Sequence, residues 1–228
     1  MDAPLAYALA IGEVAWINVL LSGDNAVVIA LACRSLPDNQ RKLGVTFGAG
    51  AAILLRIGFA FIVSWLLDTP FLRAAGGALL LYIAVSLARG DDAEGKDVAA
   101  PNQLWRAVAT IAIADAAMSL DNVIAIAAVA DGDYYLFIIG LVLSIPLIVV
   151  GATLITKLLV KFPIIVWAGA ALLGWVGGHL IAEDESLMHL MWRQPPEAAV
   201  YIMALACTIL VVIAAYLLRR YDARKVSA

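Results

Sequence analysis

The chain has 228 residues, of which 64% are hydrophobic and only 14% are charged. Because a soluble domain carries about 25% charged residues, this composition predicts an integral membrane protein. The net charge of −3 is too small to indicate a nucleic-acid partner. The long apolar runs lack the alternating hydrophobicity of an outer-membrane barrel and exclude that class.

Apolar segments long enough to cross a bilayer follow one another along the chain. We expect seven of them, at residues 5–33, 43–67, 71–88, 104–130, 134–160, 162–182 and 198–218. No Lys or Arg precedes the first segment and no A-x-A cleavage site follows it, so we expect it to be retained rather than removed as a signal peptide. The predicted fold class is an all-α polytopic membrane protein.

The positive charges predict how the chain is oriented. If the N-terminus lies outside, twelve of the 15 Lys and Arg residues face the inner side and only Arg73 and Arg193 face outward. The remaining one, Arg56, falls within the second segment. Since cytoplasmic loops carry an excess of Lys and Arg, we expect an N-out, C-in topology.

Two matching tetrapeptides place carboxylates inside apolar segments. They are Ser22-Gly23-Asp24-Asn25 in the first segment and Ser119-Leu120-Asp121-Asn122 in the fourth. A carboxylate at the centre of a bilayer costs about 2.5–3.5 kcal/mol or more, so each tetrapeptide is a functional-site hypothesis. In the expected topology the first segment runs inward and the fourth runs outward, so the two motifs point in opposite directions.

Similarity between the two halves extends beyond the motifs. Residues 75–80 are echoed by residues 168–173, and Gly58 and Pro70 are matched 93 positions later by Gly151 and Pro163. This pattern predicts an inverted-topology repeat, the build of many secondary transporters. We expect a single transmembrane domain over residues 1–228, with repeat 1 at 5–88, a linker at 89–103, repeat 2 at 104–182 and an extra helix at 198–218.

Each motif belongs to a longer polar stripe. One helix face would carry Asn18, Ser22 and Asn25, and its counterpart would carry Asp115, Ser119 and Asn122. All six side chains are oxygen donors. In a regular helix each motif Asp lies about 120° away from its stripe. We therefore expect either a helix break near Gly23 or a carboxylate that approaches from the side. The second copy has an acid, Asp115, where the first has Asn18, so the expected site is asymmetric.

The donor set favours a hard divalent cation. Asp24, Asp115 and Asp121 supply carboxylates, and carboxylate and carbonyl oxygens suit Mg²⁺, Ca²⁺ and Mn²⁺. Met118 adjoins Ser119, and a thioether contact would favour Mn²⁺. The alternative is a Met that packs in a helix interface. A purely structural role is also open for the polar set, because such side chains can join helices by hydrogen bonds.

Two further charges lie at membrane depth. Glu13 could be an outer gate ligand or a proton carrier. Arg56 is expected to pair with a carboxylate. It could keep a motif Asp ionised in the absence of metal, be displaced by the metal, or form a fixed ion pair.

The depths of the motif carboxylates leave two arrangements open. In straight helices Asp24 and Asp121 would stand on the order of 10 Å apart along the bilayer normal. Either the helices converge on one shared site, or each Asp serves one access state.

The paired S-x-D-N motifs in oppositely directed spans, with an acidic position six residues before the Asp, resemble the TerC family. The short seven-span layout resembles its YjbE/YkoY-type branch. This family is implicated in manganese efflux and tellurite resistance, and some members in metal supply to exported enzymes. The resemblance implies a metal-site core of Asp24, Asn25, Asp115, Asp121 and Asn122. Asn18 departs from the Glu that other branches often carry.

The sequence therefore predicts a multi-pass protein of a bacterial inner (plasma) membrane that exports Mn²⁺, ahead of Ca²⁺ or Mg²⁺. We expect alternating access between the two three-helix halves, with proton counter-transport as an option. No nucleophile and acid–base set is visible, so we expect no enzyme. The alternatives are a membrane scaffold that supplies metal to a partner complex or to exported enzymes, with residues 89–97 or 183–197 as its docking surface, and an exporter of a small organic substrate.

Overall fold

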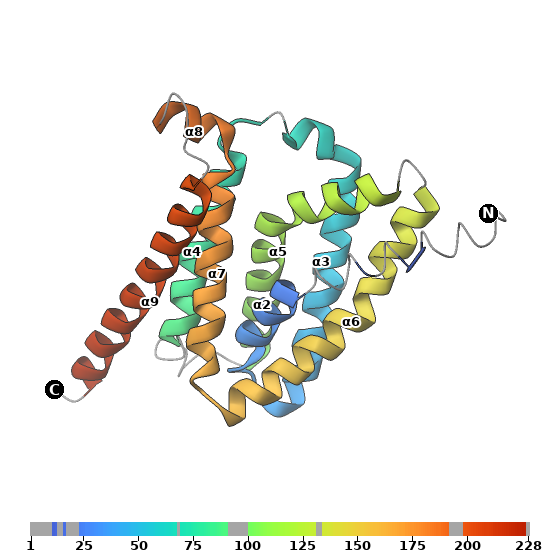
Figure 1. Ribbon diagram of the computed structural model, residues 1–228. Helices are drawn as coiled ribbons and strands as arrows, with labels where there is room; N and C mark the ends of the chain where they lie inside the picture. The colour runs from blue at the N-terminus through green and yellow to red at the C-terminus, as the bar shows by residue number, and fades with distance from the viewer. Residues whose placement is uncertain are drawn as a thin grey trace.

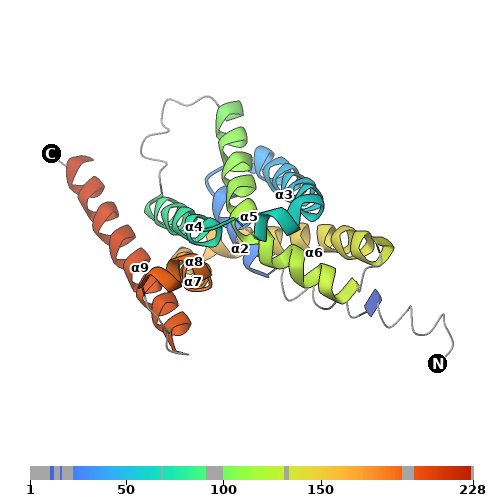
Figure 2. The ribbon, with the colours of Figure 1, turned by 90° about the horizontal axis from the view of Figure 1, so that it is seen from above.

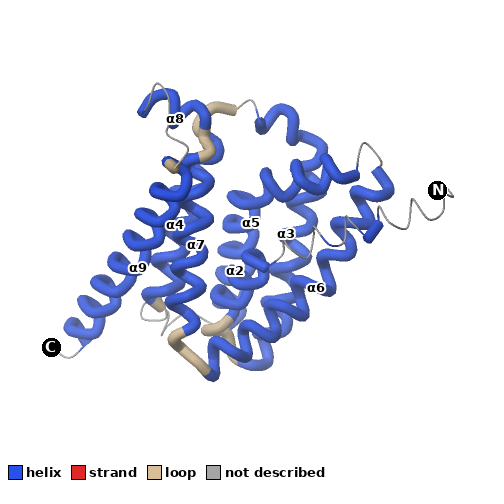
Figure 3. The backbone as a smooth tube through the Cα atoms, viewed as in Figure 1, coloured by secondary structure: helices blue, strands red, loops and turns tan. Residues whose placement is uncertain are grey.

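The computed structural model is all-helical over the residues that it describes, which are 11–12, 16, 23–67, 69–90, 100–130, 134–191 and 198–226. Eight helices and no strand occur in these ranges (Figures 1 and 3). They are α2 (Gly23–Cys33), α3 (Asp38–Leu67), α4 (Leu72–Arg89), α5 (Ala100–Ala130), α6 (Tyr134–Lys161), α7 (Ile165–Ala182), α8 (Glu185–Met191) and α9 (Ala199–Val226). The all-α prediction is confirmed for this part of the chain.

Four of these helices are long and apolar enough to cross a membrane. The spans are Asp38–Phe59 in α3, Leu72–Arg89 in α4, Ile165–Ala182 in α7 and Ala199–Lys225 in α9. Shorter apolar stretches occur at Gly23–Cys33 and Ile148–Leu159. α5 and α6 occupy the predicted fourth and fifth segments, while most of the predicted first segment lies outside the described residues. The count of seven therefore stays a prediction.

The turn between α2 and α3 is held by one arginine. The side chain of Arg41, in the first turn of α3, pairs with Asp38 at 2.5 Å and donates to the backbone carbonyls of Arg34 and Leu36. Carbonyls at a helix C-terminus have no partner within the helix and need an outside donor. Arg41 supplies it, which fixes the reversal of direction that brings α3 back alongside α2 and α5.

The helices form two groups (Figures 1 and 2). In the four-helix bundle, α2, α3, α5 and α6 pack against one another, and in the three-helix unit, α4 packs with α7 and α9. The two groups meet through α4 against α5, α2 against α7 and, less extensively, α6 against α7. The expected three-helix halves are therefore not separate bodies, because α4 lies against α7 and α3 against α5. Hydrophobicity alone did not indicate this exchange of partners.

Glycines bring the helices of the three-helix unit into backbone contact. A Cβ atom on Gly177 of α7 would lie 2.9 Å from the carbonyl oxygen of Gly77 in α4, and one on Gly178 would lie 2.7 Å from the Cα of Ala204 in α9. Any larger residue would force the helices apart. Small residues at the interface are the usual means by which membrane helices approach closely, so we interpret α4, α7 and α9 as one rigid body.

Candidate functional site

The first motif stands at the start of α2. Asp24 lies in its first turn and is half-buried, while Asn25 is buried. One Asp24 carboxylate oxygen, Oδ1, accepts a hydrogen bond from the backbone N–H of Asn25 at 2.8 Å. The partial positive charge of a helix N-terminus favours a carboxylate at this position. The α2 terminus therefore presents a carboxyl group beside buried apolar residues of the same helix.

A buried ion pair joins α3 to α5. Arg56 and Asp115 are only 1% and 4% exposed. The Nη2 of Arg56 donates to Asp115 Oδ1 at 2.5 Å, and its Nε donates more weakly to Oδ2 at 3.4 Å. The hydroxyl of Ser119, one turn further along α5, donates to the same Oδ2 at 2.7 Å. The predicted shared face of Asp115 and Ser119 and the expected carboxylate partner of Arg56 are both confirmed.

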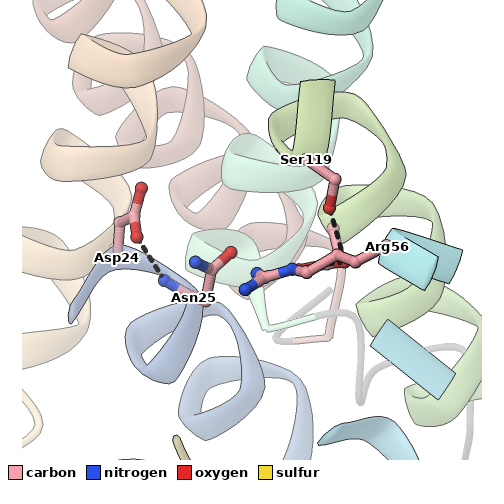
Figure 4. Close-up of polar contacts among 5 residues, drawn as sticks. Asp24, Asn25, Arg56 and Ser119 are labelled. Atoms are coloured by element: carbon pink, nitrogen blue, oxygen red, sulfur yellow. Dashed lines mark hydrogen bonds and ion pairs between the residues drawn. The ribbon is translucent and has the colours of Figure 1, made fainter. Parts of the chain in front are cut away.

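Three helices direct these side chains toward one another. Figure 4 shows the guanidinium of Arg56 extending from α3 toward Asn25, whose side chain lies between it and Asp24. Asp24 thus lies on the far side of Asn25 from the Arg56–Asp115 pair. Asp24 and Asn25 of the first motif and Asp115, six residues before the second motif Asp, thus belong to one polar cluster, which we call the Asp24–Asp115 cluster. Its members are Asp24, Asn25, Arg56, Asp115 and Ser119.

Apolar packing surrounds this cluster and accounts for Met118. Met118 is 4% exposed and belongs to a hydrophobic core cluster that also contains Leu31 of α2 and Leu173 of α7. This burial agrees with the packing role, and a thioether contact with an ion stays a prediction. Charges within such surroundings interact more strongly than in water, because the effective dielectric constant is lower.

Several predicted site residues fall outside the described part of the molecule. Glu13, Asn18 and Ser22 lie outside the described residues, and α5 carries Asp121 and Asn122 in a stretch whose side chains are not described. Among the side chains that are described, no group of three His, Cys, Asp or Glu residues comes together. The Asp24–Asp115 cluster contributes two carboxylates, one amide, one hydroxyl and one guanidinium to the site.

One buried carboxylate escaped the sequence reasoning. Asp184, just before α8, is 4% exposed. Its Oδ1 accepts from the backbone N–H of Leu187 at 2.9 Å, and its Oδ2 accepts from that of Ala74 in α4 at 3.0 Å. It therefore caps α8 and ties it to α4. An Asp directly before a helix is a typical N-cap signal, but the link to α4 has no local signature.

Comparisons with known proteins agree with this membrane architecture. The family model for "Integral membrane protein TerC family" matches residues 4–226. The uncharacterized membrane protein YjbE of Bacillus subtilis is 42% identical over 185 residues, which is 81% of this chain and 84% of YjbE. YkoY of the same organism is 28% identical over 78% of this chain and 61% of its own length.

A more distant relative is longer. The UPF0053 protein YegH of Escherichia coli is 29% identical over 187 residues, which cover 73% of this chain but only 35% of YegH. No solved structure matches the chain. The match of the family model across nearly all residues, together with the identity to YjbE, establishes an integral, multi-pass membrane protein. The chain belongs to the TerC family of integral membrane proteins.

Proposed function

We propose that this protein transports a divalent metal cation across a bacterial inner membrane, with Mn²⁺ export as the principal candidate. The observation that carries the proposal is the Asp24–Asp115 cluster, in which two carboxylates and a buried arginine meet among apolar helices. Ionisable side chains are expensive in such an environment and mark ion pathways in membrane proteins. A protein without an ionic cargo would gain little from retaining three of them in one cluster.

The donor chemistry defines the cargo class. Asp24, Asn25 and Asp115 would bind the ion together with Asp121 and Asn122, and oxygen ligands of this kind suit Mg²⁺, Ca²⁺ and Mn²⁺. Because Met118 packs in the hydrophobic core, a thioether contact does not support Mn²⁺ over the other two. The preference for Mn²⁺ thus rests on the family resemblance, and the proposed role is non-enzymatic.

The helix contacts support the proposed inverted repeat within one transmembrane domain. If α2, α3 and α4 are replaced by α5, α6 and α7, and the reverse, the α3–α5 contact becomes an α6–α2 contact and the α4–α5 contact becomes an α7–α2 contact. All four of these contacts are present. The same exchange relates α2–α3 to α5–α6. We propose seven spans in the N-out, C-in orientation, which the Lys and Arg distribution favours.

The grouping of the helices suggests which bodies move. Gly76 of α4 approaches Ala117 of α5, and Gly169 of α7, 93 positions after Gly76, approaches Val27 and Leu31 of α2. These two seams are the principal junctions between the three-helix unit and the four-helix bundle. We therefore propose that alternating access arises from movement of the α4–α7–α9 unit along α2 and α5, which carry the cluster, with proton coupling as an option.

Flux measurements in sealed proteoliposomes test the proposal. The full-length protein is reconstituted around a Mn²⁺-sensitive dye, and Mn²⁺ entry is compared with entry of Ca²⁺ and Mg²⁺. We expect Asp24→Asn and Asp115→Asn to reduce flux on the order of tenfold or more, because each removes a charged ligand. Asp38→Asn is the matched control, since Asp38 is 92% exposed and outside the cluster.

Two results would contradict transport. If the wild-type protein binds Mn²⁺ but moves none, the scaffold interpretation replaces it. If no divalent cation binds and flux requires an organic solute, the exporter of a small organic substrate replaces it.

A further inference from the structure

We propose that Arg56 is a built-in counter-cation, which neutralises Asp115 when no cargo is bound and which the divalent cation displaces. This inference rests on the proposed function and specifies how the same site is regulated. It selects the displaced-arginine alternative over a fixed ion pair.

The hydrogen bonds at Asp115 restrict how its carboxylate can bind a metal. Arg56 donates to both of its oxygens, and Ser119 donates to Oδ2 as well. These donors occupy three of the roughly four lone-pair sites of the carboxylate and leave one site, on Oδ1, beside the guanidinium. The guanidinium must therefore withdraw, at least from one oxygen, before both oxygens of Asp115 can bind a metal. The weaker of its two bonds, at 3.4 Å, is the one expected to open first.

The charge of the cluster leads to the same conclusion. With Asp24 and Asp115 ionised and Arg56 protonated, the described side chains carry one net negative charge. A divalent ion added beside the guanidinium would place like charges within a few Å in surroundings of low dielectric constant, where their repulsion is strong. Within the described cluster, withdrawal of Arg56 leaves Asp24 and Asp115 for the two positive charges of the ion, so cargo and arginine compete for Asp115.

Arg56 pairs with Asp115 and points toward the side of the cluster that holds Asp24. Its side chain extends from α3 across to α2, where Asn25 lies between the guanidinium and Asp24 (Figure 4). An arginine that served only as a fixed ion pair between α3 and α5 would need only Asp115 as its partner. An arginine directed at the shared space between α2 and α5 can instead substitute for the cargo ion itself.

If Arg56 is such a counter-cation, a carrier that lacks Arg56 should still exchange cargo across the membrane. It should not be able to return empty. With metal on both sides of the membrane, every reorientation carries a neutralised site. With metal on one side only, the carrier must reorient once in each cycle without cargo. If Arg56 were absent, the carboxylates would then have no counter-charge within a closed, apolar interior. Only this second mode of transport depends on Arg56.

The test compares Arg56→Gln and Arg56→Lys in the full-length, detergent-purified and reconstituted protein. Mn²⁺ affinity is measured by calorimetry. Exchange is measured with radioactive Mn²⁺ and equal Mn²⁺ on both sides, and net flux with Mn²⁺ on one side only. Arg89→Gln is the matched control, because Arg89 forms a similar two-bond pair with Asp222 at the end of α4, outside the cluster.

For Arg56→Gln we expect Mn²⁺ to bind about tenfold more tightly or better, since no buried ion pair must be broken. Exchange should persist while net flux falls on the order of tenfold. Arg56→Lys should also bind Mn²⁺ more tightly, since an ammonium lacks the planar two-donor fork, but it should keep net flux because it keeps the charge. Arg89→Gln should match the wild-type protein in all three measurements.

Unchanged or weaker Mn²⁺ binding by a folded Arg56→Gln variant would overturn the inference, as would a parallel loss of exchange and net flux. If that variant does not fold, Arg56→Lys decides, and binding no tighter than in the wild-type protein would overturn it. A wild-type protein that neither binds nor moves a divalent cation would instead refute the proposed function itself.

Discussion

Breaking the Arg56–Asp115 pair from one side should destabilise the protein more than removing both partners. The two side chains are 1% and 4% exposed, and three hydrogen bonds end on the carboxylate. Removing one partner of a buried pair typically costs 3–5 kcal/mol, roughly, because a charge stays behind uncompensated. We expect about 3 kcal/mol for Asp115→Asn, since the Asn oxygen still accepts one hydrogen bond and the Nε contact is long.

The double variant distinguishes desolvation from the loss of attraction. Arg56→Met supplies an apolar side chain of similar length, and together with Asp115→Asn it leaves no uncompensated charge in the core. We therefore expect Arg56→Met with Asp115→Asn to lose less stability than either single change. The free energies of unfolding are measured in detergent with a chelator present, so that cation binding adds nothing to the stability.

A second ion pair provides the control for this cycle. Arg89 and Asp222 form a comparable pair with the two side chains 32% and 23% exposed. Solvent-accessible pairs contribute little to stability because water screens their attraction, so Asp222→Asn should have a small effect. If the two changes at Arg56 and Asp115 were additive, or if Asp115→Asn were as mild as Asp222→Asn, the argument from buried charge would be wrong.

Three further predictions concern packing, the shared hydroxyl and the helix cap, and all are measured as unfolding free energies in detergent. Gly77→Ala should cost about 1–3 kcal/mol, because its Cβ would lie 2.7 Å from a side-chain carbon of α7. Gly50→Ala, which meets nothing within 4 Å, should be neutral or slightly stabilising; equal losses would contradict a tight α4–α7 interface. Ser119→Ala should cost about 1.5–3 kcal/mol, the value of a hydrogen bond to a charged group. Thr156→Val, which removes a buried hydroxyl bonded within its own helix, should cost less, and the reverse order would refute the role of the shared hydroxyl. Asp184→Ala should cost about 2 kcal/mol by leaving two backbone N–H groups without their acceptor, whereas a loss below about 0.5 kcal/mol would show that the cap is dispensable.

Local chemistry along the helices could be predicted well. The spacing of Asp115 and Ser119 placed both on one face because residues four apart overlie one another in a helix, and the hydroxyl does reach the carboxylate. The expense of an unpaired charge at membrane depth likewise required a carboxylate partner for Arg56. Both predictions depend only on geometry within a helix or on the chemistry of one side chain.

Partners between helices could not be predicted in the same way. Apolar segments rich in Ala, Gly and Leu offer nearly equivalent surfaces, and lipid competes with every helix face, so hydrophobicity does not choose a neighbour. The choice depends on shape, as at Gly77 and Gly177, where the backbones of α4 and α7 meet. The packing of α4 against α7 and the link from Asp184 to α4 both depend on such contacts.

The two charges that depart from the repeat pair with each other. Asp115 corresponds to the uncharged Asn18 in the first copy, and Val149 stands 93 positions after Arg56, the spacing that matches Gly58 with Gly151. A symmetric pair of motifs would have neither the extra acid nor the arginine. Since Arg56 contacts Asp115, these two residues together add no net charge to the site. They add a neutral pair that a cation can open, and this is the property that a counter-cation for an empty carrier requires.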